Sequence, residues 1–129
     1  MRDSSGTFYG TTDFGGTTGN GTIFSLDPNG QETILHNFDG TGGRSPIADL
    51  ARDSLGNLYG TTFQGGQQTE GGVAFKLDST GAFTILHTFL GPEGYGAYGG
   101  VILDKSGNLY GTTVYGGDFG YGVVYKLTP

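Results

Sequence analysis

The sequence of 129 residues contains no cysteine, which excludes disulfide bonds and thiolate metal sites. Basic residues are also few, since six Lys and Arg stand against twelve Asp and Glu, for a formal net charge of −6. Nucleic-acid binding requires clustered Lys and Arg at the phosphates, so this balance argues against a nucleic-acid partner. No apolar run approaches the roughly 20 residues of a membrane-spanning helix, and residues 1–6 lack the apolar stretch of a signal peptide. We therefore expect no membrane span, and we expect any export signal to lie outside this chain.

Glycine, by contrast, is abundant, with 28 residues where average usage is about 7%. Such enrichment often marks disorder, but disordered segments have few aromatic residues, whereas 13% of this sequence is aromatic. Interior glycines each cost about 1 kcal/mol in a helix relative to alanine, which disfavours helical structure. The composition therefore predicts an all-β protein with many tight turns.

An internal repeat organises the whole sequence. The segment Gly-x-x-Tyr-Gly-Thr-Thr begins at Gly6, Gly56 and Gly107, so the period is about 50 residues. An aspartate lies three residues before each copy, and a pair of adjacent glycines follows each one. We assign the chain to a single repeat region whose first and last copies are incomplete. The region is 1–129, and its copies are approximately 1–45, 46–96 and 97–129.

Each repeat holds four candidate strands, rich in the aromatic and β-branched residues that strands prefer. In the second copy these strands are residues 47–51, 57–62, 73–77 and 83–89. Asp-x-x-Gly turn sequences precede the second strand and separate the third from the fourth, so the last two are predicted to form a hairpin. The glycine inside the second strand, Gly60 in this copy, indicates a bulge or a close approach between repeats.

Alternation along the strands assigns side chains to faces. In the third strand, the apolar side chains of one face are Val73, Phe75 and Leu77. The fourth strand is apolar on both faces, with Phe83, Ile85 and Phe89 on one and Leu86 on the other. This pattern fits a sheet packed between two neighbouring sheets. Four short antiparallel strands per repeat are typical of β-propeller blades, and an elongated β-repeat array is the alternative. Rings close with about 4–8 blades, so the roughly 2.5 blades here are expected to be part of a larger ring.

The motifs together resemble a known family. They are Asp-x-x-Gly-Asn-Leu-Tyr-Gly-Thr-Thr (53–62), the glycine pair, the Gly-Val and Lys-Leu segment (72–77), and Thr-Ile-Leu-His-x-Phe (84–89). In this order they resemble the GloVer tandem repeat of bacterial "choice-of-anchor" proteins, and the resemblance covers essentially the whole chain. It implies a propeller-like repeat and a secreted or cell-surface location. The family has no assigned catalytic residues, so the resemblance assigns none here.

Repeated polar residues are interpreted as structural. His36 and His87, the two histidines, occupy equivalent strand positions, and one histidine per repeat does not supply the three or four ligands of a metal site. Asp3, Asp53 and Asp104 fit the first position of a turn. We therefore assign no catalytic residue, no metal site and no cofactor, with Ca²⁺ on a loop as the remaining alternative.

The tyrosines fall into two groups. Tyr9, Tyr59 and Tyr110 recur in the second strand, where we expect core positions with their hydroxyls bonded near the sheet edge. Four others lie in or near the variable loops, where exposed aromatic rings can stack on sugars or proteins. These predicted ligand contacts are Tyr95, Tyr98, Tyr115 and Tyr121.

The sequence therefore predicts a non-enzymatic repeat module of an exported or surface bacterial protein, with a role in binding or adhesion. A glycan or a surface protein is the expected partner. One alternative is a self-assembling structural unit whose unpaired end strands join neighbouring chains. Another is a fragment of a propeller-scaffold hydrolase or lactonase, because lactonase-like and NHL-type propellers have loosely similar blades.

Overall fold

A computed structural model of the chain describes residues 1–66 and 71–128. These residues form ten strands and one short 3-10 helix, η1 (Gly91–Glu93), and the strands make three antiparallel sheets. The first sheet contains β1 (Phe8–Thr12), β2 (Thr22–Leu26) and β3 (Glu32–Asn37). The second contains β4 (Ala51–Arg52), β5 (Leu58–Thr61), β6 (Val73–Leu77) and β7 (Phe83–Thr88). The third contains β8 (Ile102–Leu103), β9 (Leu109–Thr112) and β10 (Val124–Leu127). The predicted all-β fold is confirmed.

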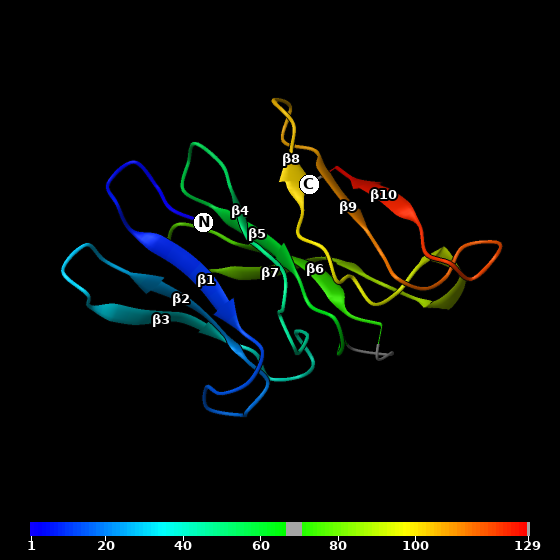
Figure 1. Ribbon diagram of the computed structural model, residues 1–129, viewed down its shortest axis with the longest axis horizontal. Coiled ribbons are helices and arrows are strands. Elements are labelled where there is room, and N and C mark those ends of the chain that lie inside the picture. The colour runs from blue at the N-terminus through cyan, green and yellow to red at the C-terminus, as the bar shows by residue number, and fades with distance from the viewer. Residues whose placement is uncertain (67–70, 129) are drawn as a thin grey trace.

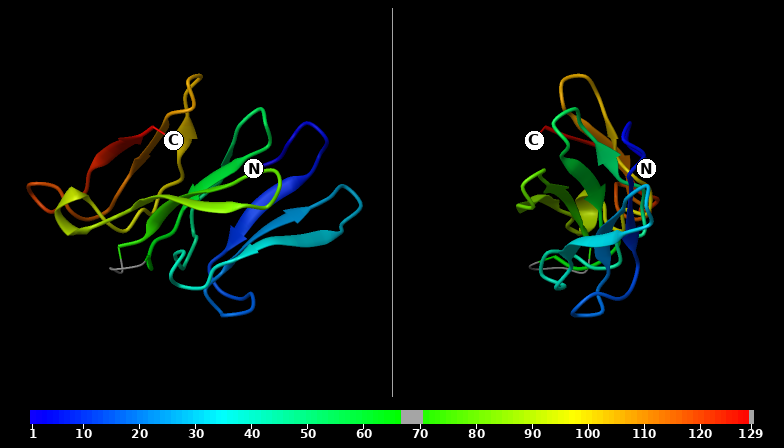
Figure 2. Two further views of the ribbon diagram at one scale, coloured as in Figure 1. Left: turned by 180° about the vertical axis from the view of Figure 1, so that it is seen from behind. Right: turned by 90° about the vertical axis from the view of Figure 1, so that its left-hand side faces the viewer.

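Each sheet is a meander in which strands adjacent in sequence are adjacent in the sheet. Figure 1 shows the three sheets side by side in chain order, and the rear view in Figure 2 shows them fanned open. β4 and β8, the first strands of neighbouring sheets, lie close to each other. No sheet of the described residues closes into a barrel, and the arrangement is that of successive blades in a partial, propeller-like array. The one helix described is a single short turn, so none has the length or apolar character to cross a membrane.

The connections alternate between the two ends of the sheets because neighbouring strands run in opposite directions. Tight turns lie at one end, as in the predicted hairpin of β6 and β7. There the Gly81 N–H donates to the Asp78 carbonyl at 3.0 Å, and the Asp78 carboxylate accepts the N–H groups of Thr80 and Ala82. The longer connections that follow β5, β7 and β9 lie at the other end, which we call the loop face (Figure 1).

The first strand of the complete repeat is shorter than the sequence predicts and lies further along the chain. Alternation predicts a strand over residues 47–51, whereas β4 is Ala51–Arg52. The preceding residues contact the first sheet instead. The Ala48 carbonyl accepts a hydrogen bond from the Thr11 hydroxyl at 3.4 Å, and Leu50 packs into the core between the sheets. The predicted bounds were wrong because contacts between sheets, and not strand pairing, hold this segment.

A β-bulge changes the face that the end of β7 uses. The pairing of β6 with β7 shifts register between Ala74 and Phe75, and Leu86 is the inserted residue. Ile85 packs in the core toward the first sheet, but Phe89 packs with Ala74 on the face toward the third sheet. Strict alternation places Phe89 with Ile85, and that prediction was wrong because the inserted residue reverses the faces beyond it. β2 and β3 show the same shift.

Gly60 lies beneath an aromatic ring of its own sheet. A Cβ atom on Gly60 would lie 2.6 Å from the ring of Phe75, which extends over it from the neighbouring strand β6. The equivalent pairs are Phe24 over Gly10 and Tyr125 over Gly111. The Tyr125 hydroxyl is buried with no hydrogen-bond partner in the described residues, and burial raises the pKa of Tyr125 to about 12. The glycine is therefore required by a close contact with an aromatic ring within its own sheet. The sequence had suggested a bulge or a close approach between repeats as the reason for this glycine.

The hydrophobic core lies between the sheets. At the first interface, the ring of Phe38 lies 5.4 Å from that of Phe75 and 5.7 Å from that of Phe83, centroid to centroid. The buried residues there are Ile23, Phe38, Leu50, Leu58, Val73, Phe75 and Leu77. Between the second and third sheets they are Tyr59, Val101, Leu109, Ala74, Phe89 and Ala97. The predicted packing of a sheet between two neighbours is confirmed, since the second sheet buries apolar side chains against both the first and the third.

In the second copy, both threonines of the repeated Gly-Thr-Thr segment make side-chain hydrogen bonds. The Thr61 hydroxyl donates to the Gly99 carbonyl at 3.3 Å and so links the second sheet to the connection that leads into the third. The buried Thr62 hydroxyl accepts the Val73 N–H at 3.0 Å and donates to the Gln64 carbonyl at 2.9 Å. The repeated segment is therefore used by the scaffold itself.

Candidate functional site

Two of the predicted ligand-contact tyrosines meet on the loop face. Tyr95 lies in the connection between β7 and β8, and Tyr115 lies in the connection between β9 and β10. Their backbones exchange two hydrogen bonds of 3.0 and 3.2 Å, and their rings stack with centroids 5.1 Å apart at an interplanar angle of 25°. The two residues are 39% and 45% exposed. The loops therefore hold a stacked pair of rings in contact with solvent.

Tyr98 extends this aromatic surface through Phe63. The two rings meet edge to face with centroids 5.7 Å apart, and Tyr98 is 63% exposed. Gly96 lies between Phe63 and Tyr115, because a Cβ atom there would be 3.1 Å from the first ring and 3.2 Å from the second. We call Phe63, Tyr95, Tyr98 and Tyr115 the aromatic cluster. Three connections that are distant in sequence build it, namely those after β5, β7 and β9.

Tyr121, the fourth predicted contact, does not join the aromatic cluster. It is 90% exposed, and its backbone bridges Gly116 within the same connection. In the described ranges it makes no ring contact with another aromatic residue. The structure therefore brings together three of the four predicted tyrosines and leaves Tyr121 apart.

The neighbouring junction shows that the scaffold does not need aromatic residues at these positions. Between the first and second sheets, the same backbone bridge joins Arg44 and Gln64, with hydrogen bonds of 2.7 and 3.2 Å. Arg44 and Gln64 are the repeat equivalents of Tyr95 and Tyr115. Because the backbone makes the same bridge with either pair, the tyrosines are a property of this junction and not of the repeat.

The sequence pattern does not single out Phe63. It follows the Gly-Thr-Thr segment directly, and its repeat equivalents are Asp13 and Val114, so no repeated pattern draws attention to it. The one feature of the sequence that points to Phe63 is its position at the start of a connection on the loop face, next to the variable loops that carry the predicted tyrosines. Recognising it required knowing that the connections after β5 and β7 meet.

The repeated aspartates hold turns, as the sequence predicts. The Asp53 carboxylate accepts N–H groups from Leu55 and Asn57, the Asn57 side-chain amide at 2.7 Å and the Tyr59 hydroxyl at 3.1 Å. The expected core position of Tyr59, with its hydroxyl bonded near the sheet edge, is thereby confirmed. In the third copy, the Asn108 side-chain amide is the largest cause that lowers the pKa of Asp104 to about 2, while desolvation opposes it. These carboxylates are already fully engaged in local hydrogen bonds.

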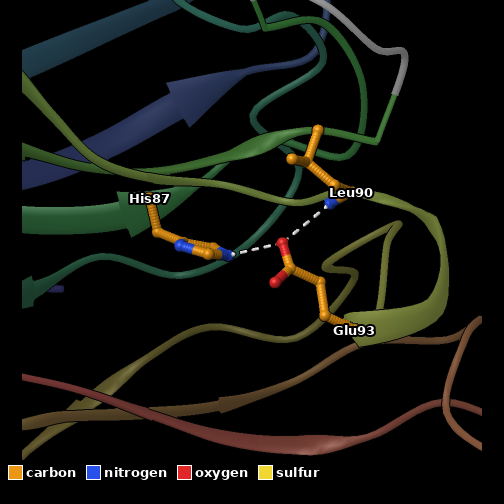
Figure 3. Close-up of polar contacts among 3 residues, drawn as sticks. All are labelled: His87, Leu90 and Glu93. Atoms are coloured by element: carbon orange, nitrogen blue, oxygen red, sulfur yellow. Dashed lines mark hydrogen bonds and ion pairs between the residues drawn. The ribbon is translucent and has the colours of Figure 1, made fainter.

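The two histidines lie at different junctions and have different partners. The His36 ring stacks on Phe83 with centroids 4.0 Å apart. Burial lowers the pKa of His36, and the nearby charge of Asp39 opposes this shift only in part. The His87 Nε2 lies 3.2 Å from the Glu93 carboxylate, which also accepts the Leu90 N–H at 3.2 Å (Figure 3). Neither histidine has a second one beside it. Across residues 1–66 and 71–128, no three His, Asp or Glu side chains gather into a group that could hold a metal ion.

Residues 1–129, the full length of the sequence, match the family profile of the Gloeobacter/Verrucomicrobia repeat. The chain belongs to this family. The resemblance to the GloVer repeat is thereby confirmed. Comparison with curated proteins and with solved structures gave no match.

Much of the Gloeobacter/Verrucomicrobia repeat motif has a structural task here. The aspartate and tyrosine close the turn before the second strand, the glycine accommodates an aromatic ring, and the two threonines bond neighbouring backbone. These residues maintain the scaffold of the repeat. The residues of the aromatic cluster lie outside the repeated motif, on the connections of the loop face.

Proposed function

We propose that this chain is a non-enzymatic binding module of an exported or surface protein, and that its aromatic cluster binds carbohydrate. The observation that supports this most directly is the contrast between the two junctions. The same backbone bridge bears Arg44 and Gln64 at one junction and the stacked Tyr95 and Tyr115 at the next. A feature that the scaffold does not require is a candidate for function.

The chemistry of the cluster favours a neutral sugar. Tyrosine rings offer flat apolar faces that pack on the C–H faces of sugar rings, and their hydroxyls donate and accept hydrogen bonds. The formal charge of −6 disfavours strongly anionic ligands. The ligand we propose is therefore a neutral oligosaccharide that lies along the exposed edge of the cluster, across Tyr98 and the Tyr95–Tyr115 pair.

Tyr98→Ala provides the first test. Neutral oligosaccharides are screened on a glycan array with the wild-type chain, and the best binder is measured by isothermal titration calorimetry. We expect Tyr98→Ala to weaken binding about tenfold, because a ring-packing contact of this kind contributes roughly 1 kcal/mol or more. The melting temperature should change little, since the side chain is 63% exposed.

Tyr121→Ala is the matched control, because Tyr121 is a more exposed tyrosine on the same face and outside the aromatic cluster. Its affinity should equal that of the wild-type chain. Equal losses in the two variants, or the absence of any saturable glycan binding, would contradict the proposal.

Self-assembly is a second candidate, favoured by the outward face of the third sheet. Val124 is 81% exposed there, whereas its repeat equivalents Ile23 and Ala74 are fully buried against the next sheet. Val124 and Ile102 line a shallow pocket of about 270 Å³ on this face. If the face joins copies, sedimentation of the wild-type chain gives a mass that rises with concentration, and Val124→Asp gives a monomer. A monomeric wild-type chain at every concentration would rule this candidate out.

A further inference from the structure

A pocket lies between the last strands of the first two sheets. β3 and the connection that follows it form one side, and β7 forms the other. The pocket has a volume of about 440 Å³, which is within the range of small-molecule sites. His36, Asp39 and Gly42 are on the first side, and Phe83 and Ile85 are on the second. The described residues that line it include no Lys or Arg and no member of the aromatic cluster.

The Asp39 carboxylate is fixed at this pocket by its own connection. Its Oδ1 accepts the Gly42 N–H at 2.8 Å and the Thr41 hydroxyl at 2.9 Å. These two bonds lower the pKa of Asp39, the Gly42 N–H most of all, while desolvation opposes them. Oδ2 accepts no hydrogen bond from the described residues. The pocket therefore holds an ionised carboxylate with one oxygen available to a donor.

His36 supplies a hydrogen-bond acceptor to the same pocket. Its ring is held flat against Phe83, with centroids 4.0 Å apart and an interplanar angle of 2°. Because burial lowers the pKa of His36 in spite of the charge of Asp39, the ring is neutral at pH 7 and one of its nitrogens is an acceptor. In the described ranges neither nitrogen has a hydrogen-bond partner, and neither is sealed from solvent. A neutral acceptor together with a carboxylate suits a positively charged donor.

The residue at position 42 distinguishes this connection from its repeat equivalent. Gly42 corresponds to Glu93 in the next copy, just as His36 corresponds to His87. The Glu93 carboxylate lies 3.2 Å from the His87 Nε2 (Figure 3), so the chain supplies its own partner to that histidine. Gly42 has no side chain to do the same, and it lines the pocket beside His36. The space is therefore a property of this junction and not of the repeat.

We propose that this pocket binds a primary ammonium group on a short alkyl stem. The ammonium group has three donors and no acceptor, and it donates to Asp39 Oδ2 and to the unprotonated nitrogen of His36. Its bond to the carboxylate is charge-assisted, and the apolar stem packs on Phe83 and Ile85. The formal charge of −6 favours the approach of a cation. This site is separate from the aromatic cluster, and the inference does not rest on carbohydrate binding.

Titration of n-butylammonium into the isotope-labelled wild-type chain, followed by NMR of the backbone amides, tests the proposal. Butan-1-ol is the neutral control, because it has the same stem and no charge. We expect saturable shifts at the amides of residues 36–42 and 83–85, and binding of butan-1-ol that is about tenfold weaker. Equal binding of the two compounds, or shifts confined to other parts of the chain, would overturn the proposal.

Two sources supply such an ammonium group, a free amine and a lysine side chain of another protein. Nα-acetyl-lysine methylamide carries the same group on the backbone of a peptide. Tighter binding of this compound than of n-butylammonium assigns the pocket to a lysine side chain, and the reverse order assigns it to a free amine. Failure of both compounds to bind would overturn the proposal.

Asp39→Asn removes the charge and keeps an oxygen that accepts the Gly42 N–H. We expect it to weaken n-butylammonium binding about tenfold. Asp78→Asn is the matched control, because Asp78 also accepts backbone N–H groups in a turn but lies outside the pocket. Its affinity should equal that of the wild-type chain. Equal losses in the two variants would overturn the proposal, because net charge alone would then explain the binding.

Gly42→Leu separates the pocket from the carboxylate. A Cβ atom on Gly42 would lie 3.4 Å from its nearest neighbours, Asp39 Oδ1 and the Phe83 ring, so a side chain fits there without a backbone clash. Leucine then fills the pocket and leaves the Asp39 charge in place. We expect n-butylammonium binding to fall about tenfold, as it does when the charge is removed. Wild-type affinity in this variant would overturn the proposal, because the ligand would then need only an exposed carboxylate.

Discussion

Gly72→Ala is expected to lower the free energy of unfolding by about 3–5 kcal/mol. Gly72 has φ +89°, and a Cβ atom there would lie 2.1 Å from the Thr62 carbonyl oxygen. The backbone has little room to relieve this clash. The Gly72 N–H donates to the Gly65 carbonyl and the Gly72 carbonyl accepts the Phe89 N–H, each at 3.0 Å. Urea unfolding followed by circular dichroism measures the loss.

Gly81→Ala is the matched control. Gly81 has nearly the same backbone angle, φ +92°, but no atom lies within 4 Å of the position that a Cβ atom would occupy. The free energy of unfolding of this variant should fall by only about 1–2 kcal/mol, which is the cost of placing a non-glycine residue in a left-handed backbone conformation. If the two variants lose the same free energy of unfolding, backbone angle alone explains Gly72 and the close contact with Thr62 contributes nothing.

Phe75→Ala is expected to lower the free energy of unfolding by about 3–5 kcal/mol. The Phe75 side chain is fully buried between the first two sheets. It meets the rings of Phe38 and Phe83, each at a centroid distance of 5.4 Å, and it covers Gly60. Its removal leaves a cavity in the core and uncovers the β5 backbone, and both effects appear in a denaturant titration.

Phe24→Ala separates the two contributions. Phe24 is the repeat equivalent of Phe75 and covers Gly10 in the same way, but it lies half-buried on the outward face of the first sheet, opposite the core residue Ile23. Its removal should cost about 1–2 kcal/mol, because less apolar area is withdrawn from water there. Similar losses for Phe24→Ala and Phe75→Ala would show that covering the strand glycine, and not burial between sheets, accounts for the effect.

The strands were predictable where the signals are local. The alternation of Val73, Phe75 and Leu77 gives β6 with its observed bounds, and Asp78 marks the turn that follows it. Prediction failed where contacts between sheets compete with strand pairing. The segment 47–50 has a strand-like pattern, but it crosses from one sheet to the next and uses its polar groups there.

The candidate site was predictable in part, for a similar reason. Aromatic residues in variable glycine-rich loops identified Tyr95, Tyr98 and Tyr115, because composition and position mark such residues without any knowledge of their neighbours. Phe63 and the separation of Tyr121 depend on how three connections fold against each other. Those contacts join residues far apart in the chain, and no local pattern encodes them.

The repeat period, the all-β class, the turns and the family all follow from the order of residues, because turn chemistry and side-chain alternation act over a few positions. The placing of Phe89 toward the third sheet, the ring above Gly60 and the assembly of the aromatic cluster do not follow in this way. A one-residue bulge reverses the faces of a strand, and packing between sheets selects which loops meet. These outcomes depend on long-range contacts, so only the folded chain reveals them.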